Sequence, residues 1–272
     1  MDTLKNRKYL HAAGFVLFLF FTTILSAQSP VAPVASGPDI EIRKLPGGEY
    51  VVTHAFPWPG NSMLVPVGEK HLVMVDTPYT PEAAEWVLDW IEETLGEREI
   101  VEINTGFHFD NLGGNGPLIA RGIPVIGSDR TVDMIAERGE ESRRLFLGWL
   151  GAPKDRRFRE RYLTLEYVPP TDIFPMEEGR TVVVGGEEIR IIFPGETHSP
   201  DNVVVYFPER ELLFGGCMIL AGDRVGNTAD ANMDTWAGAV ASLETLPCRT
   251  VVPGHGLCFD PGLIRHTVEL VK

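Results

Sequence analysis

Three histidines and one cysteine lie in glycine- or proline-containing turns that follow apolar runs of the sequence. They are His108 in GFHFDNLGGN, His198 in FPGETHSPDN, Cys217 in LLFGGCM and His255 in VVPGHG, with Asp110 two residues after His108. Side chains at strand ends project onto a shared rim, so residues distant in sequence can converge on one ion. Together they offer nitrogen, sulfur and oxygen, a donor set suited to zinc.

Each of these residues has an ordinary alternative when it is considered alone. A single histidine such as His108 or His198 is often structural, Cys217 can be a small buried apolar residue, and Asp110 can cap the glycine-rich turn. His255 stands between two glycines, which allow the backbone to approach a bound group closely. The joint pattern at strand ends, rather than any one residue, predicts the metal site.

The first half of the chain alternates strand-like and helical runs that would position His108 and Asp110. Strands are expected at 48–56, 62–68 and 71–77, before Thr80 and Pro81 open a helix. Further elements are expected in the first half as follows: the helix 81–96, the strand 100–104 leading to the His108 motif, the strand 123–128 and the helix 129–150. This order predicts β-α-β units.

A second half is expected to begin near residue 171 and to carry His198, Cys217 and His255. Its expected elements are a hairpin over 181–193, a second hairpin over 203–214, a helix over 234–246, a strand over 249–254 and a terminal helix. Two such halves predict an α/β fold, an αββα sandwich with two sheets face to face and helices outside.

The N-terminal 27 residues have the features of a secretory signal peptide. Lys5, Arg7 and Lys8 precede the apolar run AAGFVLFLFFTTIL, which ends near Ser26 and Ala27. The run is shorter than the roughly 20 residues of a membrane-spanning helix, although an uncleaved anchor remains an alternative. We therefore expect a signal peptide over 1–27, a linker over 28–39, one domain over 40–272 and a periplasmic or secreted protein without a membrane segment after cleavage.

The net charge limits the kinds of partner the protein can bind, and the number of cysteines limits how they can pair. The chain has a net charge of −14, and removing the basic leader leaves −16, which argues against nucleic acid as a partner. Three cysteines in an exported chain cannot all pair with one another. Cys217 is the candidate for metal binding, while Cys248 and Cys258 either pair or stay buried.

Four segments of the sequence resemble the metallo-β-lactamases: INTGFHFDNLGGN, GETHSPDNVVVYFPERELLFGGCMI, GNTADAN and PGHG. The resemblance runs from about residue 40 to the end of the chain. It implies the family's fold and zinc-dependent hydrolysis of the β-lactam ring of antibiotics, carbapenems included, and so a role in antibiotic resistance. Most relatives in the wider fold have aspartate at the position of Cys217, so the cysteine points to the true lactamase branches.

Gly106 stands where the two related subclasses carry a metal ligand. The di-zinc, broad-spectrum subclass has histidine there and the mono-zinc, carbapenem-selective subclass has asparagine. The segments INT and AFPWPGNSM resemble the mono-zinc group, whereas GNTADAN resembles the di-zinc group. The resemblance implies that Asp110, Cys217 and His255 hold one zinc firmly, and that a second zinc at His108 and His198 is weak or absent, because two protein ligands hold zinc poorly.

Catalytic roles also follow from the resemblance. A zinc-activated or histidine-activated water would attack the β-lactam carbonyl, and zinc would stabilise the leaving nitrogen. With one zinc, His108 and His198 are free to orient or deprotonate that water, assisted by Asp110. Asp76 ends an apolar strand and is either a turn residue or a partner that orients a ligand. Asn111 replaces an arginine common in the family, which is expected to loosen packing beneath the metal.

Three residues are expected to contact the substrate. The family usually has lysine where this chain has Leu220, so Arg224 is the candidate partner for the substrate carboxylate, against the alternative of a solvated loop arginine. Asn227 would polarise the carbonyl or hold the carboxylate. Trp58 would cover the substrate, unless it packs on its own loop.

Two other functions remain open at this point. One is a hydrolase of the same fold acting on thioesters, lactones or phosphoesters, which Cys217 and the lack of a histidine directly after Asp110 argue against. The other is a periplasmic zinc-binding protein that lost turnover when Gly106 and Leu220 replaced the metal ligand and the lysine of the family. We expect a monomer whose partner is a small β-lactam molecule.

Overall fold

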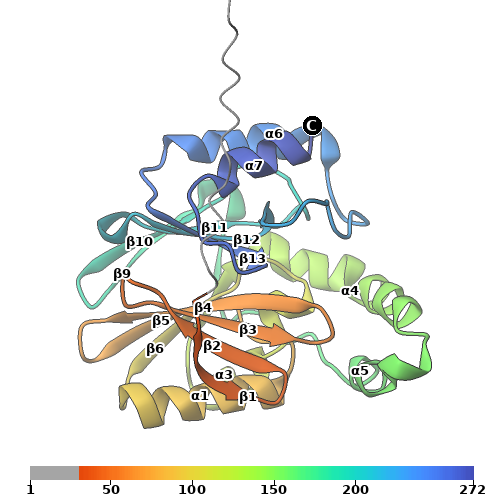
Figure 1. Cartoon of the computed structure of the whole chain (residues 1–272), viewed down its shortest axis with the longest axis horizontal. Helices are drawn as coiled ribbons and strands as arrows, with labels where there is room; N and C mark the ends of the chain where they lie inside the picture. The colour runs from red at the N-terminus through yellow and green to blue at the C-terminus, as the bar shows by residue number, and fades with distance from the viewer. Residues whose placement is uncertain (1–30) are drawn as a thin grey trace, which may run out of the picture.

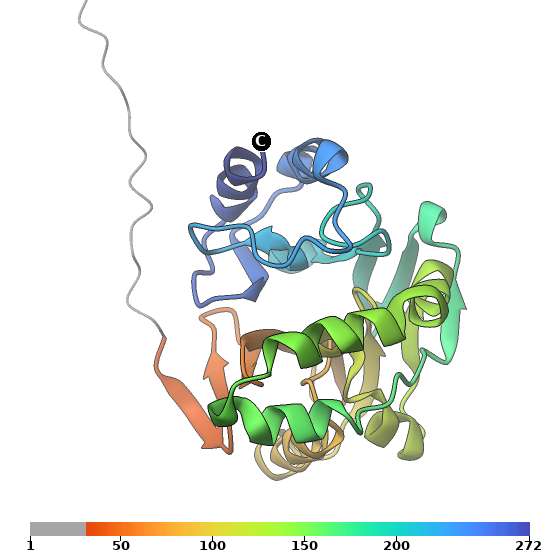
Figure 2. The ribbon, with the colours of Figure 1, turned by 90° about the vertical axis from the view of Figure 1, so that its right-hand side faces the viewer.

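The computed structural model describes residues 31–272, so the predicted signal peptide over 1–27 lies outside the described residues. Two β-sheets pack face to face with helices on their outer faces, which confirms the predicted αββα sandwich (Figures 1 and 2). The first sheet has eight strands in sequence order, β1 to β8, and the second has five in the order β13-β12-β11-β10-β9.

The first sheet is antiparallel from β1 to β5 and parallel from β5 to β8. Its strands are β1 (Pro33–Gly37), β2 (Ile40–Lys44), β3 (Tyr50–Ala55), β4 (Pro59–Val67), β5 (His71–Val75), β6 (Glu99–Ile103), β7 (Val125–Ser128) and β8 (Asp172–Phe174). The helices that connect or follow them are α1 (Pro81–Leu95), α2 (Phe109–Leu112), α3 (Asn115–Ala120), α4 (Asp129–Trp149) and α5 (Arg156–Tyr162).

Helix α1 shows why the sequence forms the outer layer of this half. It begins at the expected cap, because Thr80 Oγ1 accepts a hydrogen bond from the Ala83 amide and Pro81 takes the first helical position. Its apolar stripe, with Val87 and Ile91, packs on the outer face of the first sheet.

The second sheet is antiparallel except that β12 and β13 run parallel. Its strands are β9 (Arg180–Val184), β10 (Glu187–Ile192), β11 (Val204–Phe207), β12 (Leu212–Leu220) and β13 (Thr250–His255). Helices α6 (Met233–Ser242) and α7 (Leu263–Leu270) cover its outer face (Figure 1). Trp236 anchors α6, because its buried indole donates a hydrogen bond of 2.9 Å to the Met218 carbonyl oxygen.

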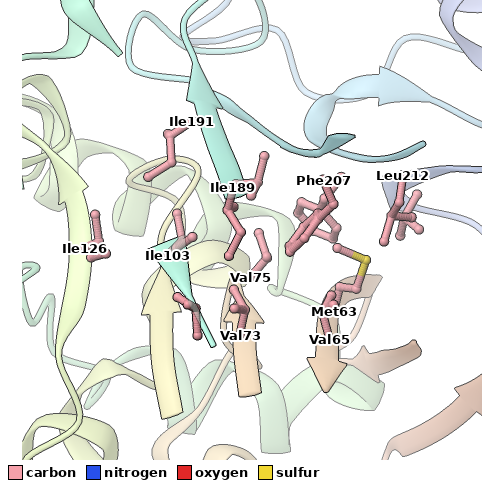
Figure 3. Close-up of a cluster of buried hydrophobic side chains, with 14 of the residues drawn as sticks. Met63, Val65, Val73, Val75, Ile103, Ile126, Ile189, Ile191, Phe207 and Leu212 are labelled. Carbon is pink, nitrogen blue, oxygen red and sulfur yellow. The ribbon is translucent and has the colours of Figure 1, made fainter. Parts of the chain in front are cut away.

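The core between the sheets is an apolar layer to which both sheets contribute (Figure 3). Met63, Val73 and Ile103 from the first sheet meet Ile189 and Phe207 from the second, and all five are fully buried. Burying each such side chain contributes about 1.5–3 kcal/mol. This layer fixes the sheets against each other, and with them the strand ends that carry the predicted site.

Three segments differ from the sequence-based expectation. Residues 33–37, expected to belong to a linker, form β1, whose Pro33 is the first residue of an edge strand, where a missing amide hydrogen is tolerated. β8 joins the first sheet beside β7, so the second sheet begins at β9 rather than near residue 171. The charged stretch after α4 forms the short helix α5, because Phe158 and Tyr162 bury one side of it.

Within residues 31–272, no helix combines the length and apolar character that crossing a membrane requires.

Candidate metal and active site

The predicted donor residues come from both sheets and meet at one rim of the sandwich. Asp110 lies in α2 just after β6, Cys217 lies within β12, and His255 is the last residue of β13. Gly216 has a φ of +51°, and a side chain there would lie 2.8 Å from Thr105 Oγ1. Because the β12–β13 register shifts at Gly216, the irregular strand directs Cys217 toward Asp110.

The Asp-Cys-His cluster, composed of Asp110, Cys217 and His255, has the spacing of a zinc site. Cys217 Sγ lies 3.3 Å from Asp110 Oδ2 and 3.7 Å from His255 Nε2, and His255 Nε2 lies 3.2 Å from Asp110 Oδ2. Tetrahedral zinc with bonds of about 2.0 to 2.3 Å separates its ligand atoms by roughly 3.3 to 3.7 Å. The three side chains therefore fit a zinc ion without rearrangement.

Hydrogen bonds behind the cluster orient its donor atoms. His255 Nδ1 lies 2.7 Å from the Pro59 carbonyl oxygen, which only accepts, so Nδ1 carries a proton and Nε2 is the ring atom that faces the cluster, where its lone pair becomes available to a metal when the ring is neutral. Asn111 Nδ2 lies 3.7 Å from Cys217 Sγ and donates to Asp76 Oδ2 at 2.8 Å. Asp76 also accepts from the amide and the hydroxyl of Thr105, both at 2.7 Å.

These contacts test the sequence-based expectations for Asp76 and Asn111. Asp76 is more than a turn residue, because it accepts the buried hydrogen bonds of the network that holds Asn111 against Cys217. The expectation that Asn111 loosens packing beneath the metal is wrong, because the residue is 1% exposed and its side chain is hydrogen-bonded on several sides. Its amide is short enough to bridge Asp76 and Cys217.

The electrostatics of the cluster suit metal binding. Burial opposes ionisation of Asp110, but the hydrogen bond and charge of His255 outweigh it and hold the pKa of Asp110 well below its usual range. Burial opposes protonation of His255, but Asp110 outweighs it and raises the pKa of His255. Burial, with the neighbouring Asp110 charge, raises the pKa of the Cys217 thiol well above normal. Without a cation the thiol therefore keeps its proton, and metal binding would release it.

The histidine pair, His108 and His198, lies beside the cluster but lacks a third donor. The two buried rings have centroids 5.2 Å apart, and burial together with His108 lowers the pKa of His198 to about 3. A Cβ on Gly106 would lie 2.6 Å from Asn202 Nδ2. In the described part of the chain, Asp110, Cys217 and His255 are the only group of three His, Cys, Asp or Glu donor atoms within 4.8 Å of one another.

Sequence reasoning missed two residues behind the histidine pair. Asp230 Oδ2 lies 3.2 Å from His108 Nε2, and Asp230 Oδ1 accepts from Nε and Nη2 of Arg138 at 2.9 and 2.8 Å. Burial would raise the pKa of Asp230, but these hydrogen bonds and charges lower it. Asp230 belongs to the GNTADAN segment already noted, which was the available signal. Arg138 lies on α4 and resembled any solvated helix arginine.

A cavity of about 1160 Å³ opens above the cluster and the histidine pair. Trp58 lines it and packs on Phe146 and Trp149 of α4, with ring centroids 5.9 and 5.8 Å away. Trp58 therefore packs against α4, and it remains 38% exposed. This arrangement gives the cavity an aromatic wall, composed of Trp58, Phe146 and Trp149.

The polar substrate candidates line the same cavity. Arg224 is the only lysine or arginine among the described residues that line it, and its side chain is 87% exposed beside Asp223. Leu220 and Asn227 line it as well, and Asn227 Oδ1 accepts a hydrogen bond from the Ala229 amide at 3.0 Å. The Asn227 amide nitrogen is thus the part of that side chain left for another partner.

The remaining cysteines lie elsewhere. Cys248 and Cys258 are free thiols at the margin of the apolar cluster under α6 and α7, and each is partly exposed. Pairing between them, one of the alternatives from the sequence, is therefore not what the structure has.

A comparison of the chain with known protein families supports the fold and the site described above. The model of the metallo-beta-lactamase superfamily matches residues 55–255, and the chain belongs to this superfamily. The family binds zinc, and the Asp-Cys-His cluster lies inside the matched region.

Individual relatives narrow the comparison. The chain is 26% identical over 264 residues to a metallo-beta-lactamase type 2 of Bacteroides fragilis, covering 92% of this chain and 94% of the relative. It is 28% identical over 221 residues to a metallo-beta-lactamase type 2 of Bacillus cereus, covering 79% and 73%. A metallo-beta-lactamase structure from Pontibacter korlensis superposes with a TM-score of 0.70 at 29% identity, covering 85% of this chain and 98% of that one. The chain is thus similar to class B β-lactamases in both sequence and fold.

Proposed function

We propose that this protein is an exported, monomeric zinc hydrolase that opens the β-lactam ring of antibiotics, carbapenems included. The observation that carries the proposal is the Asp-Cys-His cluster on the wall of a large cavity, directly beside the histidine pair. The relatives named as metallo-beta-lactamases support the same reaction.

Asp110, Cys217 and His255 would hold one zinc ion. Bound zinc would act as a Lewis acid that stabilises the negative charge on the nitrogen leaving the opened ring. The Pro59 carbonyl oxygen orients the His255 ring from behind, and Asp110, Cys217 and His255 all line the cavity.

The histidine pair would manage the attacking water. His198 stays neutral far below pH 7, so its lone pair can accept a hydrogen bond from water and orient it. His108 is backed by Asp230, which stabilises the imidazolium that forms when His108 takes a proton from that water. Asp110 lies beside His108 and His198 and would help to align the water.

Substrate binding would use the rim of the cavity. Arg224 would pair with the substrate carboxylate, and the free Asn227 amide nitrogen would donate to the carboxylate or to the ring carbonyl. Trp58, supported by Trp149, would cover the apolar side of the bicyclic ring.

The test is carbapenem hydrolysis by metal-stripped protein as zinc is added stepwise, followed by loss of the β-lactam chromophore. We expect activity to peak near one equivalent of zinc and to fall with more. Activity that rises beyond one equivalent would contradict the one-zinc assignment. Absence of turnover with carbapenems, penicillins and cephalosporins at every zinc level would overturn the lactamase proposal, and a parallel panel of thioesters and lactones would then identify a related hydrolase.

A further inference from the structure

A buried ion pair lies directly behind His108, on the side away from the cavity. The Asp230 side chain is 2% exposed and the His108 side chain is 3% exposed, while Arg138 reaches them from α4 and is 33% exposed. Asp230 Oδ2 faces His108 Nε2 at 3.2 Å, and Asp230 Oδ1 faces Nε and Nη2 of Arg138. Water has little access to the contact between Asp230 and His108, so the protein itself must satisfy these two groups.

The hydrogen-bonding capacities of the three side chains leave one arrangement of protons. Arg138 only donates, and the ionised carboxylate of Asp230 only accepts. His108 Nε2 must therefore carry a proton to make the 3.2 Å contact. In the neutral imidazole the other nitrogen, Nδ1, then holds the lone pair.

His108 needs this support more than a residue of a complete metal site would. The chain has Gly106 where a third donor would be, and Asn202 Nδ2 occupies the space next to it. Two histidines without a third ligand cannot rely on a metal ion to fix their rings. The orientation of His108 must therefore come from the protein.

We propose that Asp230 and Arg138 are positioning residues that hold His108 with its proton on Nε2 and turn its Nδ1 lone pair toward the cavity. The role of this lone pair in hydrolysis rests on the proposed function, but the position of the proton does not. Helix α4 thereby has two tasks, because it carries Arg138 and also the aromatic wall residues Phe146 and Trp149.

The most informative variant is Asp230→Asn. An asparagine in this place would turn its carbonyl oxygen toward Arg138 and its NH₂ group toward His108, because Arg138 cannot accept a hydrogen bond. Nε2 of His108 would then accept, and the proton would move to Nδ1. The same exchange of carboxylate for amide gives the wrong histidine tautomer in the serine protease triad, where it costs about 10⁴-fold in kcat.

The proton position can be read without any turnover. Long-range proton–nitrogen NMR of the full chain labelled with ¹⁵N-histidine, metal-stripped, distinguishes the two tautomers, and His108→Gln assigns the signals. We expect an Nε2-protonated His108 in the original chain and an Nδ1-protonated His108 in Asp230→Asn. In Asp230→Asn combined with Arg138→Gln, the amide is free to turn either way, so both tautomers are expected.

Activity of the zinc-loaded protein gives the second readout. We expect Asp230→Asn to lower kcat by about 10–100-fold and Arg138→Gln by about tenfold, with KM changed less than threefold. Arg138→Lys should recover part of the loss, since it restores the charge. Arg130→Gln is the matched control, because Arg130 lies on the same helix but pairs with the exposed Glu137, and it should change neither readout.

The outcomes separate the two proposals. An unchanged His108 tautomer in Asp230→Asn would overturn the positioning role, even if kcat fell. An original chain that hydrolyses no β-lactam but shows the tautomer switch would retain the positioning role and overturn the proposed function. If Asp230→Asn does not fold, Arg138→Gln decides, because a fall in kcat no larger than that of Arg130→Gln would overturn the role of Arg138.

Discussion

The Asp-Cys-His cluster and the histidine pair lie side by side at one rim but are built in opposite ways. The cluster has three donor atoms within 3.7 Å of one another, and Pro59 and Asn111 support it from behind. The pair has two rings, a glycine in place of a third donor and an ion pair behind one ring. The surroundings of a donor therefore decide its role, since they equip the cluster to hold a cation and the pair to handle protons and water.

Removing the thiol should have the largest effect, because the cluster is then left with two donors, as in the histidine pair. We expect Cys217→Ser to hold less than one equivalent of zinc after dialysis and to lose activity by a factor on the order of 100 or more. Zinc content and the thiolate absorption of the cobalt-substituted protein measure the effect. Cys248→Ser removes a thiol away from the rim and should keep both, and full zinc retention by Cys217→Ser would contradict the assignment.

The two regions should also respond to acid in opposite directions in metal-stripped protein. The pKa of His198 is about 3 in the folded protein against 6.5 for an ordinary histidine, so between pH 6.5 and 3 the unfolded chain binds a proton that the folded protein does not bind. The contribution of His198 to the free energy of unfolding therefore falls as the pH is lowered, by about 2 kcal/mol at pH 5. His255 has a raised pKa, so its contribution is complete below pH 6.5 and is lost as pH rises through its folded pKa.

Urea unfolding of two variants at pH 7 and pH 5, in the presence of a chelator, checks this contrast. His198→Gln should remove about 2 kcal/mol of the stability loss between the two pH values. His255→Gln should increase that loss, because it deletes a group that stabilises the fold most at the lower pH. Equal pH dependence in the two variants would show that the regions do not differ in this way.

A third donor at position 106 would make the histidine pair more similar to the Asp-Cys-His cluster. We expect Gly106→His to strengthen binding of a second zinc by about tenfold, since three protein ligands hold zinc better than two. The new Cβ would lie 2.6 Å from Asn202 Nδ2, so Asn202 must move and the fold should lose about 1–3 kcal/mol.

Gly106→Ala separates these two effects, because it adds the same Cβ without a donor atom. Calorimetric zinc titration should show one site in Gly106→Ala and two in Gly106→His, with similar losses of stability in urea. A single zinc site in both variants would mean that the position of Asn202, rather than the missing donor, limits the histidine pair.

Apolar periodicity located most of the strands and predicted the sandwich, and donors at strand ends predicted a shared metal site. The particular set Asp110, Cys217 and His255 was implied by the resemblance to the metallo-β-lactamases. Periodicity did not predict β8, since three residues after a long helical excursion carry no periodic signal. Arg138 and Asp230 were missed for another reason. A charged residue on an amphipathic helix resembles a solvated one, and only the tertiary structure brings α4 against the loop that carries Asp230.

Among the residues that the structure describes, neither region contributes a lysine or arginine to the cavity lining, so Arg224 remains the candidate partner of the substrate carboxylate, and its removal has the smallest predicted effect. Its side chain is 87% exposed, so a pair with a substrate carboxylate would be screened by water and salt. We expect Arg224→Ala to raise KM for a carbapenem roughly three- to tenfold, with unchanged kcat and zinc content, and the difference should shrink at high salt. Arg249→Ala, an exposed arginine paired with Glu211, is the matched control. An unchanged KM in Arg224→Ala would leave carboxylate recognition to Asn227 and the bound cation, which would tie substrate binding to the Asp-Cys-His cluster itself.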